Sequence, residues 1–163
     1  MPIEVFGVEH IDLTVNDVVT SSAFYDKVLG ALGFRKLDDT EQDVRWGNAH
    51  LTIAIRPSSR ANRGAHYDRY RVGLHHLALR AASRDNVDEF HRFLLQEKFT
   101  VLDAPAEYPE YGPNYYAVFF ADPDGMKLEL AHFSWGYWRR ALTDGRDPRP
   151  RYSREKNLDE KKS

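Results

Sequence analysis

An internal repeat constrains the fold of this chain more strongly than any other feature of its sequence. Residues 8–13 resemble residues 74–79, and this alignment places His10 on His76, 66 residues later. Further matches follow in the same order at nearly the same spacing, which is the sign of a duplicated structural unit. We therefore expect two copies of one module. The further matches are Phe24 with Phe90, Leu29 with Leu95, Phe34 with Phe99 and, 77 residues apart, 51–54 with 128–131.

Each copy reads as one strand, one helix and three more strands. Apolar and polar residues alternate in 8–15 and 73–80, which is the period of a strand with one buried face. Thr20 or Ser21 is the expected N-cap of the first helix, and Ser83 is the expected N-cap of the second. An insertion explains why the second copy is longer. The remaining strands are expected near 34–38, 43–47, 50–56, 99–103, 114–121 and 126–133, and the insertion near 104–113.

The pattern predicts a single domain followed by a C-terminal extension. The extension, 134–163, begins with a short amphipathic segment at 135–142 and continues in proline and charged residues, a composition that indicates partial disorder. Polar residues between the two modules indicate a linker. The domain spans 1–133, with module 1 at about 7–56, the linker at 57–71 and module 2 at about 72–133.

Strand parity brings three metal-binding residue types to the same side of the sheet. Side chains alternate across a strand, so the apolar residues that follow His10 and His76 face the helices and the two histidines face away. In the last strand, Leu128 and Leu130 face the helix, and Glu129 faces away. Two imidazoles and one carboxylate bind divalent first-row metals and leave coordination positions open. The sequence therefore predicts a metal site formed by His10, His76 and Glu129.

The composition narrows both the chemistry and the partners. The chain has no cysteine, which excludes thiolate catalysis, disulfide bonds and cysteine-ligated zinc. A net charge of −2 gives no reason to expect nucleic acid or an anionic membrane as a partner. Residues 1–13 lack the basic and apolar regions of a secretory signal. We expect a cytoplasmic protein with a small-molecule partner and no membrane span, either monomeric or a homodimer with modules exchanged between chains.

Three segments resemble the signature strands of a known superfamily. They are HIDLTV at 10–15, HHLALR at 75–80 and DPDGMKLELAH at 122–132. Together they make the chain similar, over about 7–133, to the vicinal oxygen chelate superfamily of glyoxalases, bleomycin-resistance proteins and extradiol dioxygenases. The resemblance implies an α+β fold in which two βαβββ modules form a cupped mixed β-sheet with the helices on its convex face. It also implies one divalent metal ion bound by His10, His76 and Glu129.

The fourth position of the site separates members of this superfamily. Glyoxalase I has a fourth ligand, glutamate or glutamine, where the repeat alignment places Thr52. A threonine hydroxyl is a poor ligand, so water or substrate is expected at this fourth corner, although His50 lies on the same face. His75 competes with His76 for the second position, but the repeat and the strand parity favour His76. A three-ligand site is similar to those of extradiol dioxygenases and fosfomycin-modifying transferases, which implies iron or manganese, with zinc or nickel as alternatives.

Two further residues are candidates for a catalytic role. Tyr115 shares a strand face with Glu129 and could hydrogen-bond a metal-bound oxygen, or it could pack as an ordinary strand aromatic. His66, in the linker, is a candidate general base, with a solvated loop histidine as the alternative. Two departures argue against a simple transfer of mechanism. Extradiol dioxygenases have a tyrosine where this chain has Phe119, and fosfomycin transferases have a threonine where it has Asp12.

These features favour an enzyme. We predict a metal-dependent dioxygenase or lyase that acts on a small substrate chelating the metal through two neighbouring oxygens. Dioxygenase-like chemistry is preferred, because three open positions on an octahedral metal can take two substrate oxygens and dioxygen. The alternatives are a glyoxalase-type lyase or isomerase, a fosfomycin-type transferase, and a non-catalytic drug- or metabolite-binding protein similar to the bleomycin-resistance branch.

Overall fold

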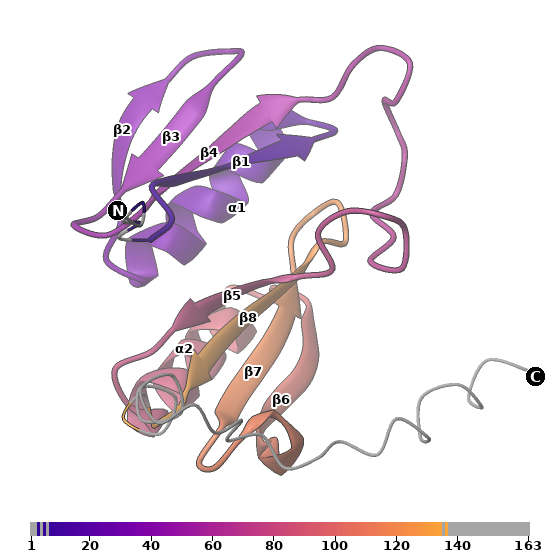
Figure 1. Cartoon of the computed structure of the whole chain (residues 1–163). Coiled ribbons are helices and arrows are strands. Elements are labelled where there is room, and N and C mark those ends of the chain that lie inside the picture. The colour runs from indigo at the N-terminus through magenta and orange to yellow at the C-terminus, as the bar shows by residue number, and fades with distance from the viewer. Residues whose placement is uncertain (1–2, 4, 6, 135, 137–163) are drawn as a thin grey trace, which may run out of the picture. The chain divides into compact units, whose positions relative to one another are not determined.

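The computed structural model of the chain describes residues 3, 5, 7–134 and 136, which form two compact units (Figure 1). Each unit contains a four-stranded mixed sheet and one α-helix. This confirms the predicted α+β class and its two βαβββ modules, with the strands in two separate sheets. The predicted segment at 135–142 and the extension after it lie outside the described residues, apart from residue 136. Of the described residues, unit 1 takes those within Met1–His76 and Ala121–Lys127, and unit 2 takes those within Leu77–Phe120 and Leu128–Ser163.

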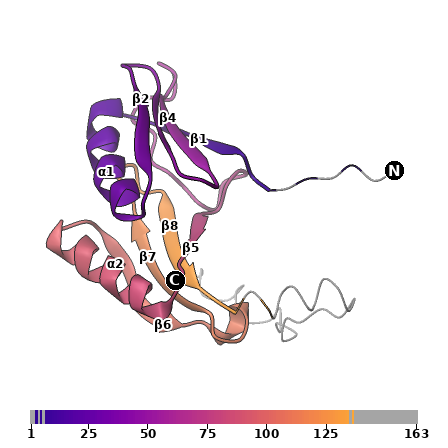
Figure 2. The same ribbon diagram turned by 90° about the vertical axis from the view of Figure 1, so that its left-hand side faces the viewer.

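Unit 1 contains the first module. Its elements are β1 (His10–Val15), α1 (Val18–Ala31), β2 (Arg35–Asp39), β3 (Val44–Gly47) and β4 (Thr52–Pro57). The strands are ordered β1-β4-β3-β2, with β1 parallel to β4 and the other neighbours antiparallel. Helix α1 lies along one side of this sheet (Figure 2). The opposite side is therefore the one on which a functional site can be built.

The second module repeats this arrangement. Its elements are β5 (Leu77–Arg80), α2 (Arg84–Gln96), β6 (Val101–Glu107), the 3-10 helix η1 (Pro109–Tyr111), β7 (Tyr116–Ala121) and β8 (Lys127–His132). The strands are ordered β5-β8-β7-β6, with β5 parallel to β8 and β6 antiparallel to β7. The predicted insertion at 104–113 lengthens β6 and forms η1. The second module is therefore longer than the first without an added layer.

Both α-helices begin at a side chain that caps their free backbone N–H groups. Asp17 caps α1, and its carboxylate accepts the N–H of Thr20 at 2.7 Å. The prediction of Thr20 or Ser21 as the cap was wrong, because α1 starts earlier than the apolar pattern indicated. Ser83 caps α2 as predicted and accepts the N–H of Asn86 at 3.2 Å. Neither helix in the described part of the chain has the length and apolar character required to cross a membrane.

Apolar residues of β3 and β4 join the sheet of unit 1 to α1. Val44 pairs with Ile55 and Trp46 pairs with Ile53 across the two strands, and all four are at most 1% exposed. The indole N–H of Trp46 donates to Asp26 of α1 at 2.8 Å. Since side chains alternate along a strand, the intervening residues face away from the helix.

The turn between β7 and β8 is held by two carboxylates of the DPDG motif. Asp122 is 6% exposed, and its Oδ1 accepts the backbone N–H groups of Asp124 and Met126 at 2.9 and 2.8 Å. Its Oδ2 accepts the hydroxyl of Tyr25 at 2.9 Å. Asp124 accepts the backbone N–H and the side-chain amide of Asn16 at 2.9 and 2.8 Å. The motif therefore fixes this turn, which belongs to unit 1, against α1 and the end of β1.

Asp124→Asn is expected to lower the free energy of unfolding by about 1–3 kcal/mol, because one oxygen that accepts from Asn16 becomes an NH2 group facing a donor. Urea unfolding followed by circular dichroism measures the change. Glu41→Gln is the matched control, since it removes the same charge from an exposed turn. Equal stability of the two variants would contradict a structural role for Asp124.

Candidate functional site

His10 is the first residue of β1 and lies on the side of the sheet away from α1. Its side chain is 61% exposed, and Nδ1 is 2.5 Å from Oε2 of Glu9. A carboxylate at Nδ1 keeps the proton on that nitrogen and leaves the lone pair on Nε2. This contact gives His10 the tautomer that a metal ligand requires.

Thr52, the predicted fourth corner, lies directly opposite His10 in the β1–β4 pair. Its side chain is half-buried and shares the face that carries His10, in agreement with the strand parity. Ala54 is the next residue of β4 on this face and is fully buried. On the neighbouring strand β4, this face therefore carries the hydroxyl of Thr52 and the methyl group of Ala54.

The two sheets do not pair in the register that the repeat alignment assumed. In unit 2, Glu129 pairs with Ala78, which is two residues after His76. In unit 1, Ala54 pairs with Asp12, which is two residues after His10. The burial patterns of β4 and β8 agree, since each begins with a half-buried residue followed by buried ones, three in β4 and four in β8. Ala54 is thus the equivalent of Glu129, and the alignment of Thr52 with Glu129 was wrong by two residues. Alanine has no donor atom for a metal.

His76 directly precedes β5 and contacts its neighbour His75. Their Nδ1 atoms are 2.7 Å apart and their rings meet edge to face, so one Nδ1 donates to the other. Burial lowers the pKa of His76, and the charges of Lys127 and Arg69 lower it further. Burial also lowers the pKa of His75, with a smaller contribution from His76. Both rings are neutral at pH 7, the form in which imidazole binds metals.

Glu129 lies in the middle of β8 and is 2% exposed. Ala131, two residues later on the same face, belongs to a buried cluster with Ala117 and Phe119. The hydroxyl of Tyr115 donates to Oε1 of Glu129 at 2.6 Å. Burial, followed by this hydrogen bond, raises the pKa of Tyr115 well above its usual value, so the hydroxyl keeps its proton. A carboxylate in such a place is a candidate for a functional group, because burial of an ionised group requires compensation.

Aromatic rings surround the hydroxyl that binds Glu129. Tyr115 stacks on Phe133 with ring centroids 5.7 Å apart and meets Tyr111 edge to face at 5.3 Å. Tyr111 stacks on Tyr108, which in turn meets the edge of Phe119. This face of unit 2 is therefore largely aromatic, with Glu129 as its buried carboxylate.

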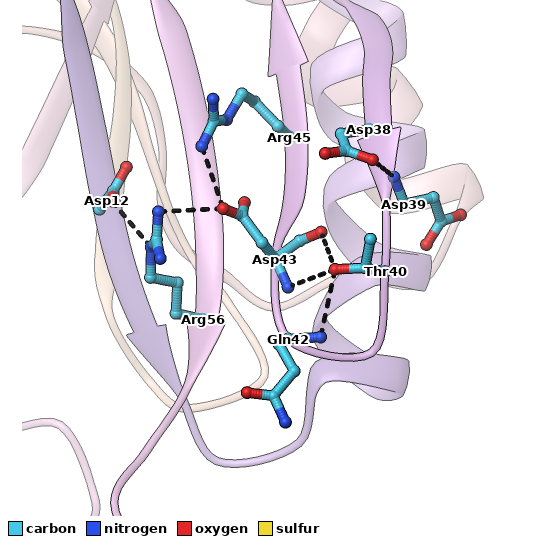
Figure 3. A network of polar contacts seen from close by, with 8 residues as sticks. All are labelled: Asp12, Asp38, Asp39, Thr40, Gln42, Asp43, Arg45 and Arg56. Carbon is cyan, nitrogen blue, oxygen red and sulfur yellow. Dashed lines mark hydrogen bonds and ion pairs between the residues drawn. The ribbon is translucent and has the colours of Figure 1, made fainter.

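The face of unit 1 that carries His10 is charged instead (Figure 3). Arg56 of β4 contacts Asp12 of β1 and Asp43, each at 2.9 Å, and Arg45 of β3 contacts Asp43 at 3.0 Å. The four side chains are between 22% and 47% exposed. At that exposure each ion pair contributes at most about 1 kcal/mol to stability. The network gives this face of the sheet charges of both signs.

The structure brings some of the predicted site residues together. Tyr115 contacts Glu129, and Thr52 lies beside His10. Within the described ranges, no group of three or more His, Cys, Asp or Glu side chains is arranged to hold a metal. Among the proposed ligands, His10 and His76 belong to unit 1 and Glu129 belongs to unit 2. His66 is an exposed loop residue, and its role as a general base stays a prediction.

Two contacts were missed at the sequence level. Glu9 engages His10, and an acidic neighbour of a candidate ligand is itself a sequence signal for such a contact. The pair of Asp12 and Arg56 was also missed. Parity placed Asp12 on the site face, and Arg56 shares that face two residues after Ala54, so their opposite charges could have indicated the contact.

A fold of two βαβββ modules, with His10 at the start of β1, His76 directly before β5 and Glu129 in β8, is typical of a glyoxalase-like class of protein. Residues 7–130 match the sequence model of the Glyoxalase/Bleomycin resistance protein/Dioxygenase superfamily, and the chain belongs to this superfamily.

Individual relatives agree with this membership. The chain is 32% identical over 121 residues to the uncharacterised protein YqjT of Bacillus subtilis (strain 168), covering 74% of this chain and 94% of YqjT. A provisionally assigned glyoxalase from Bacillus halodurans is 29% identical, with a TM-score of 0.67 over 77% of this chain and 95% of that one. A lactoylglutathione lyase from Agrobacterium tumefaciens has the same fold, at 17% identity and a TM-score of 0.59, over 78% and 94% of the two chains.

The lowered pKa values of His75 and His76 predict a pH dependence of stability for the metal-free protein. The unfolded chain, with histidine pKa values of about 6.5, binds protons more readily than the folded chain. Stability is therefore fully present above this pH and is lost as the pH falls through the lower pKa values of the folded state. Urea unfolding at a series of pH values should show this loss in the wild type and less of it in a His75→Gln, His76→Gln variant. Identical profiles would contradict the prediction.

Proposed function

We propose that the protein is a metal-dependent enzyme that acts on a small substrate bound through two neighbouring oxygens. The observation that carries this proposal is Glu129, a carboxylate 2% exposed on a face that is otherwise largely aromatic and apolar. Tyr115 engages one of its oxygens. A buried carboxylate is usually retained when it pairs with a cation or acts in chemistry. A divalent metal is a cation of the kind that such a carboxylate binds.

The donor atoms of His10, His76 and Glu129 fit a divalent first-row metal. Glu9 at Nδ1 of His10 leaves Nε2 of His10 for a metal, and His76 offers Nε2 in the tautomer in which its Nδ1 donates to His75. When bound, the metal would polarise the two substrate oxygens and stabilise negative charge that develops on them. The neutral state of His76 and the retained proton of Tyr115 mean that neither residue must change its protonation state before binding.

Dioxygenase-like chemistry is the reaction class that we favour, with iron or manganese as the metal. Ala54 cannot supply a ligand at the position equivalent to Glu129 in unit 1. Three protein ligands leave three positions on an octahedral metal, enough for two substrate oxygens and dioxygen. A glyoxalase-type lyase or isomerase is the second candidate, since a lactoylglutathione lyase shares this fold. Thr52 would then contribute through its hydroxyl or a bound water.

Protein loaded anaerobically with manganese or iron is expected to bind about one ion per chain, and His10→Ala, His76→Ala and Glu129→Gln should each weaken binding by at least about tenfold. Elemental analysis and titration with Mn²⁺ measure this. His91→Ala is the matched control, because it removes a histidine of α2 that belongs to no proposed ligand set. Negligible metal in the wild type would contradict the proposal. Undiminished metal in His10→Ala would contradict the ligand assignment.

Ala54→Glu is expected to add a fourth ligand and to lower oxygen-dependent turnover by at least about tenfold, because a coordination position needed by dioxygen is filled. Thr52→Glu, two residues earlier on the same face, should have a smaller effect. Turnover of catechols, methylglyoxal–thiol adducts and epoxides is measured with and without oxygen on iron-, manganese- and zinc-loaded protein. Zinc-dependent isomerisation of the thiol adduct without oxygen would instead support the lyase.

A further inference from the structure

The hydroxyl of Tyr115 is committed to one acceptor inside unit 2. It lies 2.6 Å from Oε1 of Glu129, the short distance typical of a hydroxyl that donates to a carboxylate. The donor is half-buried and the acceptor is almost fully buried, so water competes little for this hydrogen bond. One of the two carboxylate oxygens is therefore held in a fixed place.

Neighbouring rings restrict the motion of the Tyr115 side chain. Phe133 stacks on it at an interplanar angle of 10°, and Tyr111 meets it edge to face. Tyr111 is held in turn by stacking on Tyr108. Such contacts leave the tyrosine ring few alternative positions, because each departure loses aromatic contact. The ring contacts therefore keep the hydroxyl in the position from which it donates to Oε1 of Glu129.

We propose that Tyr115 is a positioning residue, which holds Oε1 of Glu129 so that the carboxylate presents Oε2 alone to the metal. This inference rests on the proposed function. It differs from the expectation that Tyr115 hydrogen-bonds a metal-bound oxygen, because the hydroxyl proton is already donated to the ligand itself. A carboxylate held in this way occupies one coordination position instead of two and leaves more of them for substrate.

Tyr116, the residue after Tyr115, makes a hydrogen bond of the same kind to a carboxylate that is not a proposed ligand. Tyr116 donates its hydroxyl to Asp88 of α2 at 2.7 Å, on the helix side of the same strand. It therefore has the same pair of groups, a tyrosine hydroxyl and a carboxylate, on the face of the sheet opposite Glu129. Tyr116→Phe is a matched control for Tyr115→Phe, since both remove one hydroxyl and leave the ring.

The test measures the binding of Mn²⁺ alone by titration calorimetry. Tyr115→Phe is expected to weaken binding by about 10- to 100-fold, as loss of a partner that orients a metal ligand usually does. Tyr116→Phe should leave the affinity unchanged. Cobalt-loaded protein gives an independent readout, because release of Oε1 changes the coordination and hence the visible absorption of Co²⁺. This spectrum is measured per bound ion, so a loss of folded protein cannot imitate the change.

Equal manganese affinity and an unchanged cobalt spectrum in Tyr115→Phe would overturn the positioning role. An equal loss of affinity in Tyr116→Phe would also overturn it, since the effect would then follow from stability. Absence of manganese binding in the wild type would overturn the proposed function together with this inference. If the wild type binds manganese and Tyr115→Phe binds it equally well, the positioning role alone would be overturned.

Discussion

The buried carboxylate of Asp122 holds the turn between β7 and β8 against helix α1 in unit 1. Burial raises its pKa, and the N–H of Met126 and the hydroxyl of Tyr25 partly offset that increase. A polar group at this depth destabilises the fold unless it is fully hydrogen-bonded, so the turn and the helix must keep their places. Asp124 extends the attachment to Asn16 at the end of β1. Two carboxylates of one motif thus connect the turn between β7 and β8 to a helix and a strand far away in the sequence.

The two modules share a fold but have different chemistry on their helix-free faces. The face of unit 1 that carries His10 also carries a network of arginine and aspartate side chains, which Figure 3 shows. The face of unit 2 presents Glu129 within an aromatic cluster. The two modules therefore agree in the apolar residues that pack under each helix, since both cores need them, and differ on the opposite faces. The difference between Ala54 and Glu129 at equivalent positions belongs to this divergence.

The faces of the candidate residues could be predicted because strand parity depends only on the local sequence. Tyr115 and Glu129 were placed on one face in this way, and their hydrogen bond agrees with it. The N-cap of α1 could not be predicted reliably, because Asp17 and the two residues expected in its place are all good capping types. The ring contacts of Tyr108 and Tyr111 were not predictable, since they follow from a 3-10 turn with no periodic signal.

The sequence by itself determined the duplicated modules, the side of each sheet that carries His10 and Glu129, and the strands and helices that place them. Its hydrophobic period fixes these features without reference to any partner strand. Only the tertiary structure decided the register, which makes Ala54 and not Thr52 the equivalent of Glu129. A shift of one residue would expose the core, but a shift of two keeps every side chain on its face. The apolar pattern therefore cannot distinguish the two registers, and backbone pairing between strands far apart in the chain selects one.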